Sequence, residues 1–244
     1  METIIEKTRR MFAPRKRKEC LPDYMIAEIQ GIIRHNSSPV SSSTPLDKLG
    51  FAVMDVETTG FNYKKGDEII AIGAVMVEDG EIKKEKTFHH LVYPNRQVPD
   101  PVSRLTGIDG DMLVGRLSFF GVLQQFLGFI GCNIIIGHNI PFDLGFINPK
   151  LKKYCRTEIK NRAIDTLVIA RSLDLPSKSV SLDSLLDFYG IEPVGRHSAL
   201  GDAFLTAELF IRLAAVLKDR HIHTLSELDN LIKQHARLGD DKIF

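Results

Sequence analysis

The sequence contains no tryptophan and only three cysteines, Cys20, Cys132 and Cys155. Their odd number and wide spacing, without a Cys-x-x-Cys pair, argue against a disulfide framework or a zinc ribbon and favour a reducing compartment. No apolar run is long enough to cross a membrane, and no apolar segment follows the basic N-terminus to complete a signal peptide. We therefore expect a cytoplasmic protein without a membrane partner.

An excess of charge of one sign is also missing. The formal net charge is +1, so no overall field marks the chain as a nucleic-acid binder, and any such contact must come from local patches. Hydrophobic residues make up 43% and charged residues 26% of the chain, which is ordinary for a globular protein. With 244 residues, the chain is long enough to bury a full core in one domain.

We expect three segments along the chain. Residues 1–45 form an N-terminal extension, with a basic stretch over 1–20, a short amphipathic helix over 24–34 and a Ser/Pro-rich linker over 36–45. The basic stretch is either a phosphate-binding patch or a solvated tail, and the helix docks either on the main domain or on a partner. Residues 46–220 form the main domain, and residues 221–244 carry a last helix, predicted over 224–237, and a tail.

The main domain alternates strand and helix patterns. Apolar runs predict strands over 51–56, 69–78 and 81–93, and Asp79-Gly80 is a hairpin turn sequence between the last two. An amphipathic helix over 118–130 and a short buried strand over 133–137 follow. Three strands joined by short loops and then alternating helices and strands predict an α/β fold, whose mixed sheet has an antiparallel edge.

Two carboxylates close the first apolar run. Asp55 and Glu57 stand near its end, just before a Thr-Thr-Gly turn sequence. Side chains at positions i and i+2 of a strand point to the same face, so the two acids project together. Desolvated carboxylates repel each other, and a hard divalent cation supplies both the charge and the oxygen coordination that would hold them. The alternative is a solvated acidic strand end.

A second polar group follows the strand over 133–137. His138 and Asn139 stand at its junction with a helix, and Asp143 lies in the first turn of that helix. Ligands of open α/β sheets collect at the carboxyl ends of the strands, so Asp143 should lie near the first pair of acids. The alternatives are local capping by His138 and Asn139 and an ordinary first-turn acid favoured by the helix dipole.

A third group opens the longest helical pattern, over 203–217. His197 stands in the preceding loop, five residues before Asp202. A histidine so placed can overhang a cation that the acid holds, without ligating it. The alternative is a surface histidine and an exposed helix acid.

A further acid near a strand end, Asp165, is interpreted as an N-cap or loop-anchoring residue.

Together the three groups resemble a known family. Asp-x-Glu-Thr-Thr-Gly at 55–60, His-Asn-x-x-x-Asp at 138–143 and His-x-x-x-x-Asp at 197–202 occur in the order and setting of the DEDD superfamily of 3′→5′ exonucleases. The histidine of the third motif is typical of the DEDDh subgroup, and the sequence is most similar to the epsilon proofreading subunits of bacterial DNA polymerase III. The resemblance covers residues 46–217.

The resemblance implies an RNase H-like fold, a mixed β-sheet with helices on both faces, and two bound Mg²⁺ or Mn²⁺ ions. It implies that Asp55, Glu57, Asp143 and Asp202 bind the metals and that His197 is the general base. The implied reaction is hydrolysis from the 3′ end of single-stranded DNA, releasing nucleoside 5′-monophosphates in proofreading or repair, with a DNA polymerase subunit as a possible partner. An oligoribonuclease-like RNA exonuclease and a non-catalytic polymerase-associated module are the alternatives.

Substrate contacts are predicted beside the first two motifs. The backbone at Thr58 and Thr59 is placed to meet the terminal nucleotide, and His138 follows the strand over 133–137. Phe61 or Phe142 is a candidate for stacking on a base, since aromatic side chains hold single strands without regard to sequence. The alternative for each is a core or capping role. A basic cluster within residues 150–162 borders a nucleic-acid groove or solvates a helix face.

Overall fold

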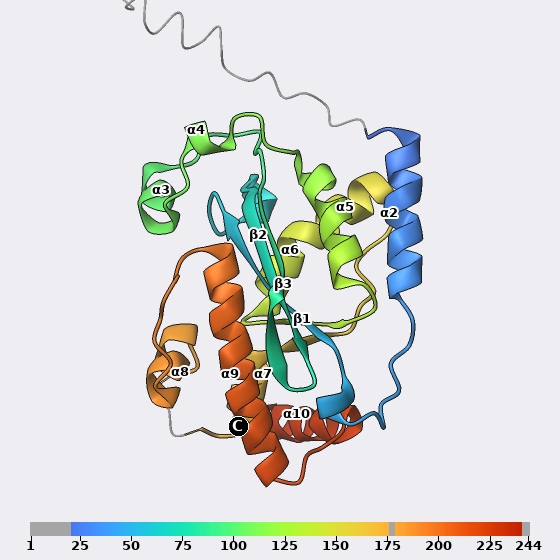
Figure 1. Ribbon diagram of the computed structural model, residues 1–244, viewed down its shortest axis with the longest axis vertical. Helices are drawn as coiled ribbons and strands as arrows, with labels where there is room; N and C mark the ends of the chain where they lie inside the picture. The colour runs from blue at the N-terminus through green and yellow to red at the C-terminus, as the bar shows by residue number, and fades with distance from the viewer. Residues whose placement is uncertain (1–20, 176–178, 241–244) are drawn as a thin grey trace, which may run out of the picture.

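The computed structural model of the chain describes residues 21–175 and 179–240 (Figure 1). The basic stretch over 1–20, with Cys20, and the last four residues of the predicted tail lie outside the described residues.

The described residues form one five-stranded mixed sheet in the order β3-β2-β1-β4-β5. Its strands are β1 (Phe51–Thr58), β2 (Ile69–Glu78), β3 (Glu81–Leu91), β4 (Ile134–Gly137) and β5 (Ala163–Asp165). The first three strands pair antiparallel, whereas β4 pairs parallel to both β1 and β5. The predicted antiparallel edge on a mixed sheet is therefore confirmed, and β1 lies at its centre.

Helices cover both faces of this sheet. One face carries α2 (Asp23–Asn36), α5 (Phe119–Ile130) and α6 (Ile140–Lys150). The other carries α7 (Thr166–Ser172), α8 (Leu182–Tyr189), α9 (Ala199–Asp219) and α10 (Leu225–Asp240). Because side chains alternate along a strand, Ala52 and Met54 of β1 pack into the first core and Phe51 and Val53 into the second. The predicted helices on both faces are confirmed.

Smaller elements join these layers. They are the helices α3 (Asp100–Thr106) and α4 (Gly110–Leu113), the short 3₁₀ turns η1 (Leu46–Lys48) and η2 (Tyr63–Lys65), and the π turn η3 (Leu151–Cys155). Figure 1 shows α3 near the start of α9, and Ile108, Leu113 and Ala199 form a small core there. The segment around α4 and the start of α9 therefore pack together at this end of the sheet.

The N-terminal helix α2 docks on the main domain, one of the two expected placements. Its Ile29 and Ile33 are buried against α5, and Asn36 Nδ2 donates to the backbone carbonyl of Leu127 over 2.7 Å. At the other terminus, α10 continues to Asp240, beyond the predicted helix end at residue 237. The domain boundary at residue 45 stays a prediction. Among the described helices, none is both long and apolar enough to cross a membrane.

Two glycines allow close packing at the start of α9, Gly73 against the sheet and Gly201 against the preceding loop. A Cβ at Gly73 of β2 would lie 2.2 Å from the carbonyl carbon of Ala199, and a Cβ at Gly201 would lie 1.9 Å from the carbonyl oxygen of Gly195. Either contact is far inside van der Waals distance, so a larger residue at Gly73 would push α9 from the sheet, and one at Gly201 would push away the loop at Gly195. The close packing brings the first turn of α9, with Asp202, against β1 and β2.

Candidate active site

Three predicted acids meet at the end of β1. Asp55 and Glu57 project from β1, and Asp202 lies in the first turn of α9, which Ser198 caps by accepting the N–H of Gly201. One carboxylate oxygen from each of the three acids lies within 4.8 Å of the others. The strand and the helix thus bring together three carboxylates from distant parts of the sequence, as the family resemblance implied.

Asp143 joins this cluster from a different direction. It lies in the first turn of α6, directly after β4, and is almost fully buried. Its Oδ1 accepts the backbone N–H of Val56 over 3.1 Å, which fixes the carboxylate to β1 between Asp55 and Glu57. The oxygens of Asp143 are not part of the tight three-residue group, but its charge acts on Asp55.

Burial raises the pKa values of all four acids, and repulsion by neighbouring acids adds to it at Asp55, Glu57 and Asp143. Burial, followed by the charges of Asp143, Asp202 and Glu57, raises the pKa of Asp55 well above its usual range. Mainly through burial, the pKa of Glu57 rises to about 7 and that of Asp143 to about 8. Burial also raises the pKa of Asp202, against the opposing charge of Arg196. Arg196 thus offsets only part of the negative charge of the four acids, and a bound cation would offset the rest.

The donor set fits a divalent cation. Asp202 Oδ1 is buried and accepts no hydrogen bond from any described residue, whereas Oδ2 is held by Arg196 Nη1 at 2.6 Å and by the N–H of His197 at 3.2 Å. A buried oxygen without a donor costs free energy unless another group satisfies it. Carboxylate oxygens are the ligands that Mg²⁺ and Mn²⁺ prefer. The orphaned oxygen and its two acidic neighbours therefore suit a hard metal ion.

The raised pKa values predict how stability varies with pH. Folded Glu57 and Asp143 keep protons up to about pH 7 and 8, above their ordinary values of 4.5 and 3.8. Their stabilising contribution is fully present below the unfolded values and is lost as pH rises through the folded ones. We expect the thermal midpoint in chelator to fall between about pH 6 and pH 8, by a free energy on the order of 2 kcal/mol or roughly 4–8 °C.

Thermal melts in chelator across this pH range measure the effect. The Glu57→Gln variant, which removes one of the titrating groups, should show a shallower slope. Added Mn²⁺ should raise the midpoint most at high pH, where the acids are ionised. A midpoint that rises with pH in chelator would contradict the proposed protonation of the cluster.

Arg196 was not among the residues predicted from the sequence. Besides Asp202, its guanidinium binds Asp183 on α8, with Nε 2.7 Å from Oδ1 and Nη2 3.2 Å from Oδ2. The only sequence signal was a basic residue directly before the histidine of the third motif, which does not reveal partners on two helices.

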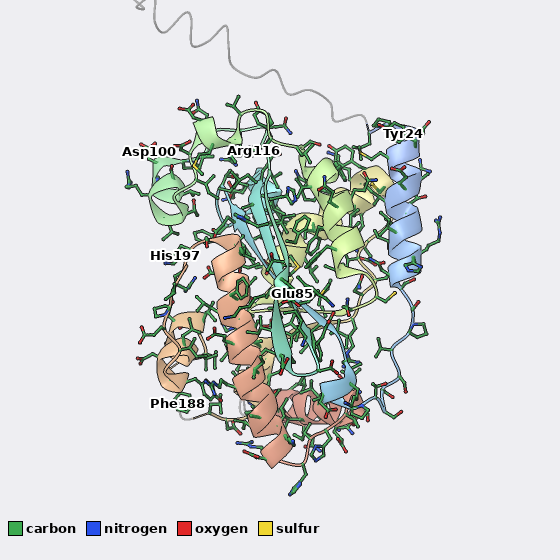
Figure 2. The ribbon with its side chains drawn as sticks, in the orientation of Figure 1. Tyr24, Glu85, Asp100, Arg116, Phe188 and His197 are labelled. Carbon is green, nitrogen blue, oxygen red and sulfur yellow. The ribbon has the colours of Figure 1, made fainter. Side chains whose placement is uncertain are left out.

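His197 lies in the loop before α9 with a left-handed backbone conformation, φ 63° (Figure 2). Its N–H donates to Asp202 Oδ2, so the histidine is tied by its backbone to a predicted metal ligand. The structure thus brings the histidine to the edge of the acidic cluster. The role of its ring as a base stays a prediction.

The predicted substrate residues differ in their placement. Thr58 and Thr59 are buried, and their hydroxyls hold the following loop by donating to the carbonyl of Gly60 and to Asp67. Phe61, in contrast, is 86% exposed at the tip of that loop. Phe142 is partly buried beneath it, with ring centroids 6.3 Å apart. Of the two aromatic candidates, Phe61 is thus the accessible one.

The remaining predicted polar residues serve local structure. Nδ1 of His138 lies 2.9 Å from the hydroxyl of Thr166 at the start of α7, and its substrate role stays a prediction. Asp165 caps α7, accepting the N–H groups of Leu167 and Asn139, which confirms its interpretation as a capping and anchoring acid. In the basic cluster, Lys152 and Lys160 share an ion pair with Glu158. These pairs favour a solvated surface over a groove.

Comparison with known proteins identifies the family. The sequence profile of the RNase T exonucleases, described as "Exonuclease", matches residues 52–210. This range contains all three motifs and the four clustered acids. The chain belongs to this exonuclease family. It is a 3′→5′ exonuclease of the DEDDh group by family, and exonucleases of this group use divalent metal ions.

Two named relatives show where such a domain occurs. The epsilon subunit of DNA polymerase III from Aquifex aeolicus is 42% identical over 163 residues, 67% of this chain and 79% of that subunit. The PolC-type DNA polymerase III of Thermotoga petrophila is 38% identical over 208 residues, 85% of this chain. The chain spans only 15% of that polymerase. The region similar to this chain is thus most of a subunit in one relative and a small part of a long chain in the other.

Solved structures share the fold. Exonuclease X in complex with 5′ overhanging duplex DNA superposes with a TM-score of 0.58 at 24% identity, over 75% of this chain and 99% of that one. The nuclease domain of 3′hExo, a DEDDh family member bound to rAMP, gives a TM-score of 0.61 at 20% identity, over 71% of this chain and 95% of that domain. The predicted RNase H-like exonuclease fold is therefore confirmed.

Proposed function

We propose that this exonuclease removes nucleotides one at a time from the 3′ end of single-stranded DNA, using two Mg²⁺ or Mn²⁺ ions. The observation that carries the proposal is that one carboxylate oxygen each of Asp55, Glu57 and Asp202 lies within 4.8 Å of the others, and that Asp202 Oδ1 is buried without a hydrogen-bond donor among the described residues. Such a cluster supplies the hard oxygen ligands of a phosphodiester hydrolase.

Each residue of the cluster has a proposed role. Asp55, Glu57, Asp143 and Asp202 hold the metal ions. When bound, the ions supply positive charge that stabilises the attacking and leaving oxygens of an in-line displacement at phosphorus. His197 takes the proton of the attacking water. The bond between phosphorus and the 3′ oxygen of the preceding nucleotide breaks, so the terminal nucleotide leaves as a 5′-monophosphate.

DNA is the favoured substrate because both named relatives are parts of DNA polymerase III. A role in proofreading or repair, with a polymerase subunit as partner, follows from the same likeness. RNA is the second candidate, because two structural neighbours are described with rAMP or with a histone mRNA stem-loop. The gathered acids argue against a non-catalytic module, since a chain without catalysis has no need to bury repelling carboxylates.

Degradation of 5′-labelled single-stranded DNA and matched RNA, in parallel with Mg²⁺, Mn²⁺ or chelator, tests the proposal. We expect a descending ladder on DNA with either metal and none with chelator. A ladder on RNA alone would show that the substrate is RNA and would favour a role in RNA processing. Intact DNA and RNA in the presence of metal would overturn the catalytic proposal.

The exposed Phe61 predicts a substrate contact. Replacing it with alanine should raise the KM for a short DNA oligonucleotide by about fivefold or more, because stacking on one base contributes about 1–3 kcal/mol. Steady-state hydrolysis measures KM. Tyr24→Ala is a matched control, since Tyr24 is 65% exposed on α2, on the far side of the molecule from His197 (Figure 2). An unchanged KM in Phe61→Ala would remove Phe61 from the substrate site.

A further inference from the structure

Arg196 bridges two helices at the edge of the acidic cluster. Asp183 at the start of α8 is largely exposed, with 67% of its side chain accessible, whereas the Asp202 side chain on α9 is only 8% accessible. The guanidinium spans from one to the other, and α8 packs beside α9 (Figure 1). Arg196 is thus anchored at the surface and reaches inward to a buried carboxylate.

The two carboxylate oxygens of Asp202 have different surroundings. Oδ2 receives both Arg196 Nη1 and the N–H of His197, while Oδ1 receives no donor from the described residues. Rotation of the carboxylate would break both hydrogen bonds to Oδ2. A guanidinium holds this geometry well because its fork is rigid, and its other edge is fixed on both oxygens of Asp183.

We infer that Arg196 is a positioning residue of the metal site, holding Asp202 Oδ2 so that Oδ1 alone is presented to a divalent cation beside Asp55 and Glu57. The inference rests on the proposed function and extends it to a residue that ligates no metal. Partners of this kind orient a ligating carboxylate, and their loss typically weakens metal affinity about 10- to 100-fold.

A purely electrostatic role predicts the opposite sign. The positive charge of Arg196 lies close to the cluster and lowers the pKa values of Asp55 and Glu57. If charge alone mattered, the same field would repel a cation, so removing Arg196 would tighten metal binding. Positioning and repulsion are therefore separated by the direction in which the metal dissociation constant moves.

Titration of the full chain with Mn²⁺, followed by calorimetry or by the electron paramagnetic resonance of free Mn²⁺, measures this constant without any nuclease assay. We expect Arg196→Gln to raise the Kd about tenfold or more. Arg196→Lys keeps the charge but lacks the planar fork that holds both oxygens of Asp183 and Oδ2 of Asp202 at once, so it should also raise the Kd. Asp183→Asn, which loosens the anchor, should have a smaller effect in the same direction. Arg212→Gln, at an exposed position of α9, is the matched control and should leave the Kd unchanged.

A Kd for Arg196→Gln that is equal to or lower than that of the parent would overturn the inference. A Kd for Arg196→Lys equal to that of the parent would also overturn it, because the positive charge alone would then be enough for full metal affinity. Thermal melts in chelator show whether Arg196→Gln is folded, and Asp183→Asn carries the test if it is not. Asp202→Asn, titrated in parallel, separates the two proposals: if it binds Mn²⁺ as the parent does, the metal site itself is wrong.

Discussion

Replacing Asp202 with asparagine should lower the rate of DNA hydrolysis by at least about a thousandfold, since a metal ion contributes several kcal/mol to the transition state. The amide keeps the shape of the side chain but is neutral and a weaker metal ligand than the carboxylate, whose buried Oδ1 accepts no hydrogen bond from the described residues. Mn²⁺ binding should weaken in parallel. The thermal midpoint in chelator should not fall, because a buried carboxylate that repels Asp55 and Glu57 has been neutralised.

Single-turnover hydrolysis and Mn²⁺ titration measure the two effects. Asp219→Asn is the matched control, because Asp219 is an exposed acid at the opposite end of the same helix, α9. It should behave as the parent in both assays. Near-full activity of Asp202→Asn would mean that the cluster at the end of β1 is not the catalytic centre.

Replacing His197 should lower the rate by about 10²- to 10⁴-fold, the usual contribution of a positioned base, while Mn²⁺ binding stays within about twofold. Two variants are needed because His197 has φ 63°, a conformation in which alanine is strained. Asparagine tolerates this conformation and cannot act as a base at neutral pH. His197→Asn is therefore the cleaner test, and His197→Ala leaves space for a small molecule.

Added imidazole distinguishes a base from a structural residue. It should restore part of the activity of His197→Ala by accepting the proton in place of the missing ring, and it should leave the parent unaffected. If both variants lost Mn²⁺ binding along with activity, and imidazole restored neither, the His197 side chain would support the metal site rather than act on water, because the backbone N–H that binds Asp202 is kept in both variants.

The elements that carry the site were predictable because their signals are local. The apolar run of β1 predicts a buried strand, and a period of two sets Asp55 and Glu57 on one face. The positions of Asp143 and Asp202 in the first turns of α6 and α9 follow from the loops before them. The rule that sites lie at the carboxyl ends of strands places Asp143 near Asp55 and Glu57, whereas the meeting of Asp202 with them was implied only by the family resemblance.

The contacts that hold the site together were not predictable from the same patterns. An arginine gives no sign of its partners, so the bridge from Asp183 through Arg196 to Asp202 depends on how α8 and α9 pack. The close approach of Gly73 to Ala199 likewise appears only once both elements are placed. The amphipathic pattern of α2 predicts a helix but does not specify the surface that buries it.

The identity of the first product tests the central claim most directly. The substrate is a single-stranded DNA whose 3′-terminal nucleotide is dC and whose other nucleotides are all dT. With Mg²⁺ or Mn²⁺, the account predicts that dC 5′-monophosphate appears before any dT product, and that chelator abolishes its release. Release of dT mononucleotide first, of a 3′-monophosphate, or of any mononucleotide in chelator would contradict a metal-dependent 3′→5′ exonuclease.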